Sequence, residues 1–155
     1  MEKKFYEEYY DTFLDLSEAP EEDALTEEEV RYYISENFEP YNEAYVGDIV
    51  FVKKFIYEDG NIGSNHLFVI VDKNKFIDIE YFGMILSSKI DKEKFKYNFR
   101  LNKDSGNGLN KDSIIKTGHI YKLNSKDVLK KVGTINMEMI DYFNRKYKEY
   151  LNGKC

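Results

Sequence analysis

The first 45 residues carry apolar positions at helical spacing. One such stripe predicts a helix over residues 3–16, and it consists of Phe5, Tyr9, Phe13 and Leu16. Thr26 and Glu29 have the spacing of a capping box, which predicts the start of a second helix. The stripe of this second helix is Val30, Tyr33, Ile34 and Phe38, and Pro40 marks its end. Both stripes need a surface to cover, so we expect the helices to pack on the rest of the chain.

From Val46 the pattern changes to short runs of β-branched and aromatic residues, separated by turn residues. These runs predict strands over residues 49–57, 66–71, 75–84, 84–90, 94–101, 113–115 and 119–123. Turn-forming residues predict loops over 58–65 and 102–112. We expect a brief helix from Asn124 to Lys131, ended by Gly133. A last helix over 136–151 should bury Ile140, Phe143, Tyr147 and Leu151. Short strands with a terminal helix predict a small, strongly bent sheet or barrel.

The charge divides the chain into two regions. Residues 1–45 carry 15 Asp and Glu against 3 Lys and Arg, a net charge of −12. Residues 46–155 carry 14 against 20, a net charge of +6. We therefore expect an acidic helical extension over 1–45 and a basic domain over 46–155, whose sign favours an anionic partner. The extension is either a solvated surface layer or a competitor for that partner's site.

Several function classes are disfavoured by the composition. No apolar run is long enough for a membrane span or a signal peptide, so we expect a cytoplasmic protein without membrane contact. The one cysteine, Cys155, cannot form an intrachain disulfide. Two histidines without ligand spacing make a metal site improbable, and no nucleotide or dinucleotide fingerprint is present. We therefore predict neither a metal nor a cofactor.

The order of segments resembles the MazF/PemK family of bacterial toxins over residues 46–151. Residues 47–50 open the first strand as Gly-Asp-Ile-Val, residues 66–74 read HLFVIVDKN, and residues 85–88 read Ile-Leu-Ser-Ser. The most specific part is residues 112–136, DSIIKTGHIYKLNSKDVLKKVGTIN, which lead into the last helix in the family's order.

The resemblance implies a mainly β, SH3-like barrel that forms a homodimer and cleaves single-stranded RNA without a metal. It also implies a separate antitoxin partner whose acidic tail covers the RNA groove. In the family an arginine opens the second strand and a Thr or Ser ends the third. These positions fall on His66, followed by Leu67 where the family has proline, and on Ser87.

The histidine at the arginine position changes the expected chemistry. Cleavage by a ribose 2′-hydroxyl needs a base, an acid and donors for the phosphate oxygens. Arginine is a permanent phosphate clamp, whereas histidine is partly charged at neutral pH but can transfer protons. We predict His66 as acid/base or phosphate ligand and Ser87 as a donor to the phosphate. The alternative is that His66 is a structural histidine at a strand entrance. The glycine-containing loop before it could act as a lid.

Other polar residues are candidate RNA contacts by charge and position. The predicted set is Lys53, Lys54, Ser88, Lys89, Arg100 and His119, and Lys116 and Lys122 could also reach phosphates. Each lysine could equally serve solubility, and His119 could be structural. Phe55 and Tyr57 could stack on unpaired bases or belong to the core.

The leading prediction is a toxin-type, metal-independent endoribonuclease that the acidic extension restrains in cis. The alternative is a catalytically silent module of the same fold that binds RNA or an antitoxin, which the histidine at the arginine position favours. A gyrase-poisoning toxin of related barrel fold is a third and weaker hypothesis. The helices of the extension could instead enlarge the core or a dimer interface.

Overall fold

The computed structural model describes residues 25–33, 44–57 and 60–153. The predicted helix over 3–16, and the positions Ile34, Phe38 and Pro40, lie outside these residues. The described helices are α2 (Glu27–Tyr33) and α3 (Met137–Gly153), with 3-10 turns η1 (Ile90–Lys94) and η2 (Ser125–Asp127). The strands are β1 (Asp48–Ile56), β2 (Ile62–Lys73), β3 (Glu80–Ser87), β4 (Asn98–Leu101), β5 (Ser113–Lys116), β6 (Tyr121–Asn124) and β7 (Val128–Thr134).

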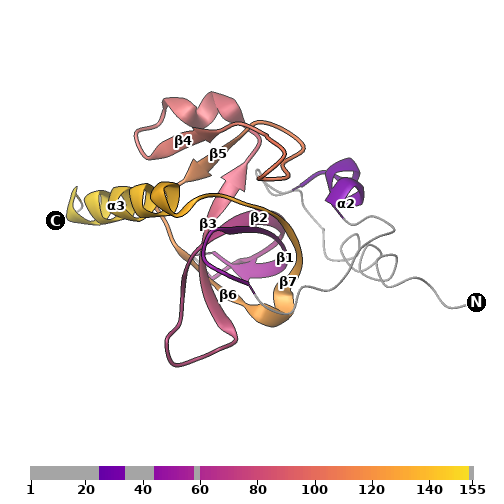
Figure 1. Cartoon of the computed structure of the whole chain (residues 1–155), viewed down its shortest axis with the longest axis horizontal. Helices are drawn as coiled ribbons and strands as arrows, with labels where there is room; N and C mark the ends of the chain where they lie inside the picture. The colour runs from indigo at the N-terminus through magenta and orange to yellow at the C-terminus, as the bar shows by residue number, and fades with distance from the viewer. Residues whose placement is uncertain (1–24, 34–43, 58–59, 154–155) are drawn as a thin grey trace, which may run out of the picture.

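All seven described strands join one antiparallel sheet, in the order β4-β5-β3-β2-β1-β7, with β6 paired to β3 (Figure 1). Strand β3 has two partners on the same edge. Its first half, Glu80 to Gly83, pairs with β6, and its last residues, Leu86 and Ser87, pair with β5. The sheet must bend where β3 changes partner. The predicted mainly β fold with a C-terminal helix is confirmed.

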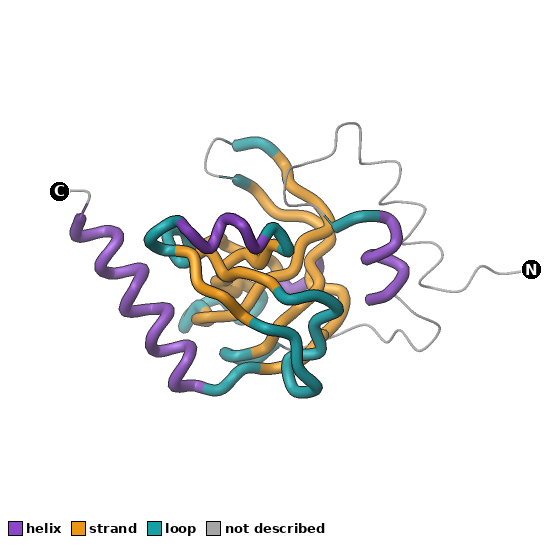
Figure 2. Tube along the Cα trace, turned by 90° about the horizontal axis from the view of Figure 1, so that it is seen from above, coloured by secondary structure: helices purple, strands orange, loops and turns teal. Residues whose placement is uncertain are grey.

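Alternate residues of the sheet enter two different hydrophobic cores. In β1, Ile49 and Phe51 belong to the first core, while Val50 and Val52 belong to the second. Helices α2 and α3 lie on opposite sides of the molecule (Figures 1 and 2) and both contribute to the first core, through Val30, Tyr33, Ile140 and Phe143. Part of the acidic extension is therefore integral to the fold.

The capping box predicted at the start of α2 is confirmed. The backbone N–H of Thr26 donates to Glu29 Oε1 at 3.2 Å, and the N–H of Glu29 donates to Thr26 Oγ1 at 3.2 Å. These reciprocal bonds satisfy donors that a helix start leaves without partners. Val30 and Tyr33 are buried as the stripe predicted.

The loop predicted over 58–65 is too long, because β2 already begins at Ile62. Ile62 pairs with Ile56 and Gly63 with Phe55, so residues 62–64 belong to the β1–β2 hairpin. Gly63 permits this pairing, since a Cβ there would lie 2.3 Å from the Phe55 ring. From the sequence, Gly63 indicates a turn, whereas in the structure it makes room for the Phe55 ring of the neighbouring strand.

The predicted helix over 124–131 is wrong. Asn124 caps only η2, where its side chain accepts from the N–H of Lys126, and β7 follows at once. Strand β7 pairs with β1, so Val128 and Leu129 are buried on the sheet. A pairing partner some 80 residues away in sequence overrides the local preference for helix.

Other predicted boundaries shift where turns interrupt the strand pattern. Residues 75–79 form a loop before β3, which runs unbroken through Gly83 and ends at Ser87. In the predicted strand over 94–101, only Asn98–Leu101 is strand, because η1 ends at Lys94. The loop over 102–112 is confirmed, although Asn107 and Leu109 are buried in it.

Helix α3 confirms the last predicted helix. Ile140 and Phe143 are buried, whereas Leu151 is exposed, contrary to the prediction. No helix among the described residues is long and apolar enough to cross a membrane.

Candidate functional site

The register of β2 and β3 brings the two predicted catalytic residues together. Leu67 lies opposite Leu86, so the next residues on the two strands, His66 and Ser87, occupy neighbouring positions. Residues opposite each other in an antiparallel pair present their side chains on the same face. His66 and Ser87 therefore lie side by side on the sheet, although they are 21 positions apart in the sequence.

His66 is buried inside β2, which begins four residues earlier, at Ile62. The sequence had instead placed this histidine at the start of the strand. Its ring is fully buried, and Nδ1 lies 2.8 Å from the carbonyl oxygen of Ser64. The ring meets Phe55 at 5.0 Å and Tyr57 at 6.4 Å between centroids, both edge-on. In this conformation the imidazole is covered on these sides by aromatic rings.

The same aromatic group reaches the second histidine. His119 is half-buried, and its ring centroid lies 4.2 Å from that of Tyr121. Tyr121 in turn lies 6.0 Å from Tyr57. The rings form one set, here called the aromatic–histidine cluster, which consists of Phe55, Tyr57, His66, Phe68, His119 and Tyr121. The two histidines are 53 positions apart in the sequence, and nothing in their spacing links them.

Ser87 ends β3 with its hydroxyl in a local turn. The side chain is buried, and Oγ accepts the N–H of Lys89 at 3.2 Å. Ser88 and Lys89 are exposed beside it. This turn gives a buried hydroxyl next to an exposed hydroxyl and an exposed cation, which are groups that can contact a phosphate.

The remaining predicted RNA contacts lie at separate places on the sheet. Lys53 and Lys54 on β1 lie close enough to Asp127 to act on its charge, together with Lys126. Burial raises the pKa of Asp127, and the three lysines oppose that rise. Arg100 lies elsewhere, on β4, where it donates to Glu93 of η1 at 3.1 Å. Lys122 on β6 lies 3.9 Å from Glu80. Lys116 ends β5, where it pairs with Asn98 of β4.

The segment that leads into α2 contacts β2 at the residue before His66. The N–H of Leu25 donates to the carbonyl oxygen of Asn65 at 2.9 Å. Asn65 has a left-handed backbone, with φ of 55°, which the sequence alone did not signal. A narrow crevice separates Leu25, Glu29 and Tyr33 from a wall that consists of Leu67, Leu86, Ser87, Ser88, Lys111 and Ser113.

Tyr33 fixes the other end of α2. Its hydroxyl accepts the N–H of Asn110 at 3.0 Å, and its carbonyl oxygen accepts from Lys130 Nζ at 2.6 Å. Burial raises the pKa of Tyr33 to about 12 and lowers the pKa of Lys130. The helix is thus held at both ends by groups of the sheet and its loops.

No group of three or more His, Cys, Asp or Glu side chains within the described ranges is arranged to hold a metal ion.

Comparisons with known proteins agree with this fold. Residues 45–151 match the family model described as PemK-like, MazF-like toxin of type II toxin-antitoxin system. A solved structure described as an endoribonuclease from Mycobacterial species is similar at 12% identity and a TM-score of 0.53, covering 74% of this chain and 96% of that one. Mycobacterium tuberculosis toxin MazF-mt6 is similar at 10% identity and a TM-score of 0.50, covering 68% and 96%. No curated protein matches. The predicted resemblance and its fold type are confirmed.

Proposed function

Because the chain belongs to the family of PemK-like, MazF-like toxins of type II toxin-antitoxin systems, we propose that it is an endoribonuclease that cuts single-stranded RNA without a metal. The family match over residues 45–151 is the observation that carries this proposal. We keep the division into an acidic extension, residues 1–45, and a barrel domain, residues 46–155. We also propose that the protein is cytoplasmic, forms a homodimer and pairs with an antitoxin.

The reaction we propose is an internal transfer at phosphorus. The ribose 2′-oxygen attacks the adjacent phosphorus while the bond from phosphorus to the 5′-oxygen breaks. A base takes the proton of the 2′-hydroxyl and an acid gives one to the leaving 5′-oxygen. The products are a 2′,3′-cyclic phosphate and a 5′-hydroxyl, and no water is consumed.

The aromatic–histidine cluster supports this chemistry because it brings together two imidazoles, the side chain that most often serves as a general acid or base. His119 is reachable from solvent, whereas His66 acts only if RNA binding displaces part of its aromatic cover. Ser87 and Ser88 supply hydroxyl donors beside Lys89, and Lys53 and Lys54 supply charge for phosphates. His66 and His119 are proposed as the acid/base groups, and Ser87 as a donor to the phosphate.

Restraint by the acidic extension is the second part of the proposal. Leu25 bonds to the residue before His66, and Glu29 shares a crevice with Ser87 and Ser88. The first turn of α2 also carries the carboxylates of Glu27 and Glu28, of which Glu27 pairs with Arg31 at 2.8 Å. Negative charge here repels RNA phosphates, and the helix itself occupies surface beside the site.

A catalytically silent binding module is the second candidate, and the burial of His66 favours it. Incubation of the purified full chain with single-stranded RNA in a chelator separates the two functions. The nuclease predicts cuts that His119→Ala removes and that become faster when the acids of α2 are neutralised. If neither the native chain nor the neutralised variant cuts any of a broad set of RNA sequences, the nuclease proposal is wrong.

A further inference from the structure

A pocket of about 340 Å³ lies between β1, η2 and the loop that leads into β3, and it borders the aromatic–histidine cluster through Phe55. Its floor is made by the buried side chains Phe55 and Leu123. Its walls include Ile56, Ile77 and Ile79, which are 46 to 63% exposed. Ile62, opposite Ile56 on the hairpin, is exposed as well. We call this hollow the isoleucine pocket.

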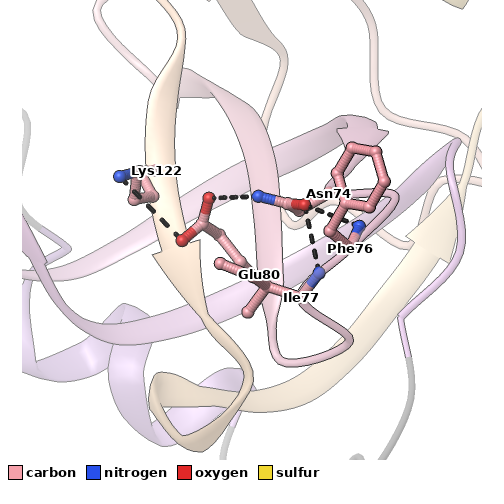
Figure 3. A network of polar contacts seen from close by, with 5 residues as sticks. All are labelled: Asn74, Phe76, Ile77, Glu80 and Lys122. Atoms are coloured by element: carbon pink, nitrogen blue, oxygen red, sulfur yellow. Dashed lines mark hydrogen bonds and ion pairs between the residues drawn. The ribbon is translucent and has the colours of Figure 1, made fainter.

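The loop that carries two of these isoleucines is held firmly by polar bonds (Figure 3). Asn74 Oδ1 accepts the N–H groups of Phe76 at 2.8 Å and Ile77 at 3.1 Å, and Asn74 Nδ2 donates to Glu80 at 2.8 Å. Glu80 also pairs with Lys122. The carbonyl oxygen of Ile79 accepts the N–H of Ser125 at 2.8 Å. The apolar side chains are therefore presented in a prearranged position, as binding surfaces often are.

Lysines surround the isoleucine pocket. Lys54, Lys122 and Lys126 line it, and Lys53 stands close enough to act on Asp127. Against these four cations the pocket has two carboxylates, Glu80 and Asp127. An apolar hollow with a positive rim fits a ligand that combines apolar side chains with negative charge.

The chain itself contains such a ligand in residues 1–24, which lie outside the described part. They carry nine Asp and Glu against two Lys, and their apolar residues Phe5, Tyr9, Phe13 and Leu16 share a helical spacing. Residue 25, which follows this segment, is attached to β2, the strand that pairs with β1 of the pocket. Leu25 is bonded to Asn65, three residues along β2 from Ile62, which corresponds to roughly 10 Å of strand.

We propose that residues 1–24 dock in the isoleucine pocket of their own chain, with their apolar stripe on the isoleucines and their acids toward the lysines. The tether at Leu25 makes the effective concentration of this segment high, so weak contacts suffice. The isoleucine pocket shares Lys54 and Phe55 with the candidate site, but docking of residues 1–24 there does not depend on nuclease activity.

Photocrosslinking in the full chain tests the proposal. A benzophenone amino acid replaces Ile79 in one variant and Tyr142, an exposed position on α3, in the control. After irradiation, peptide mapping should find residues 1–24 joined to position 79 far more often than to position 142. A mixture of isotopically heavy and light chains should show that the joined peptides come from one chain.

Two further variants test the apolar and the electrostatic contributions to docking. Phe5→Glu with Phe13→Glu removes the apolar stripe, and Lys54→Glu with Lys126→Glu reverses part of the rim, so both should reduce the crosslink from position 79 several-fold. Circular dichroism checks that the variants fold. A crosslink to a second chain, no crosslink to residues 1–24, or equal yields from positions 79 and 142 would overturn the proposal.

Discussion

The backbone N–H of Leu25 donates to the carbonyl oxygen of Asn65 at 2.9 Å, one residue before His66 on the same strand. The segment that leads into α2 is thereby held beside His66. Deletion of residues 1–44 is a poor test of restraint. Deletion would remove Val30 and Tyr33, which belong to the first core, and would change stability together with RNA access.

Neutralising the acids of α2 should strengthen RNA binding without loss of the fold. Glu27→Gln with Glu28→Gln removes two exposed charges and keeps the capping Glu29. Affinity for single-stranded RNA at low salt should rise several-fold, and the gain should vanish at high salt because the effect is electrostatic. Glu138→Gln with Asp141→Asn on α3 is the matched control. Equal gains from both pairs would show that only net charge matters.

Tyr33 should make the protein sensitive to alkali. Its pKa is raised to about 12, so between pH 10 and 12 the unfolded chain releases this proton while the folded chain keeps it. Stability should therefore fall by about 2 kcal/mol over that range, with a slope of at most roughly 1.4 kcal/mol per unit of pH. Urea unfolding of Tyr33→Phe should lack this loss. The variant should be about 1 kcal/mol weaker at neutral pH, because the N–H of Asn110 loses its acceptor.

Tyr32→Phe is the control for this experiment, since Tyr32 is its exposed neighbour. Its free energy of unfolding should change with pH in the same way as that of the native chain. If Tyr33→Phe loses stability in alkali as steeply as the native chain, the raised pKa is wrong.

Substitution of Gly63 should destabilise the β1–β2 hairpin and its aromatic contacts. A Cβ at this position meets three atoms of the Phe55 ring within 2.8 Å, and Phe55 also contacts His66 and Tyr121. Gly63→Ala should cost about 1–3 kcal/mol in thermal or urea unfolding, because the ring must leave its position. Gly153→Ala, where the added methyl meets nothing within 4 Å, should have almost no effect. Equal stability of the two variants would contradict the tight contact.

The two histidines should respond differently to replacement. His66 is fully buried among aromatic rings, so His66→Ala should lower stability by about 2–4 kcal/mol, by analogy with other large buried side chains. His119 is half-buried, so His119→Ala should cost less and should reduce RNA cleavage while the fold persists. Urea unfolding and a cleavage assay on the same samples separate the effects. Full activity of a folded His119→Ala variant would remove that residue from the mechanism.

Local signals in the sequence predicted the elements whose stabilising groups are close in the chain. The capping box of α2 involves Thr26 and Glu29, three residues apart, and it formed as predicted. Helix α3 followed from one continuous stripe. Strand β7 was missed because Asn124 and the lysines after it suggest a helix, and its partner β1 is remote in the chain.

The candidate site was only partly predictable for the same reason. The register of β2 and β3 places His66 beside Ser87. The joining of His66 and His119 through Tyr57 and Tyr121 depends on how β1, β2 and β6 come together, and no spacing in the sequence encodes it. The bond from Leu25 to Asn65 likewise depends on a left-handed residue with no glycine to mark it.

The most direct test of the central claim is the chemistry of the RNA ends. Purified full-length protein is incubated with defined single-stranded RNAs in excess chelator, and the fragments are analysed by mass spectrometry. The proposed reaction predicts a 2′,3′-cyclic phosphate on each upstream fragment and a 5′-hydroxyl on each downstream fragment. Intact RNA with every sequence from both the native chain and the Glu27→Gln, Glu28→Gln variant, or fragments with 5′-phosphate ends, would contradict it.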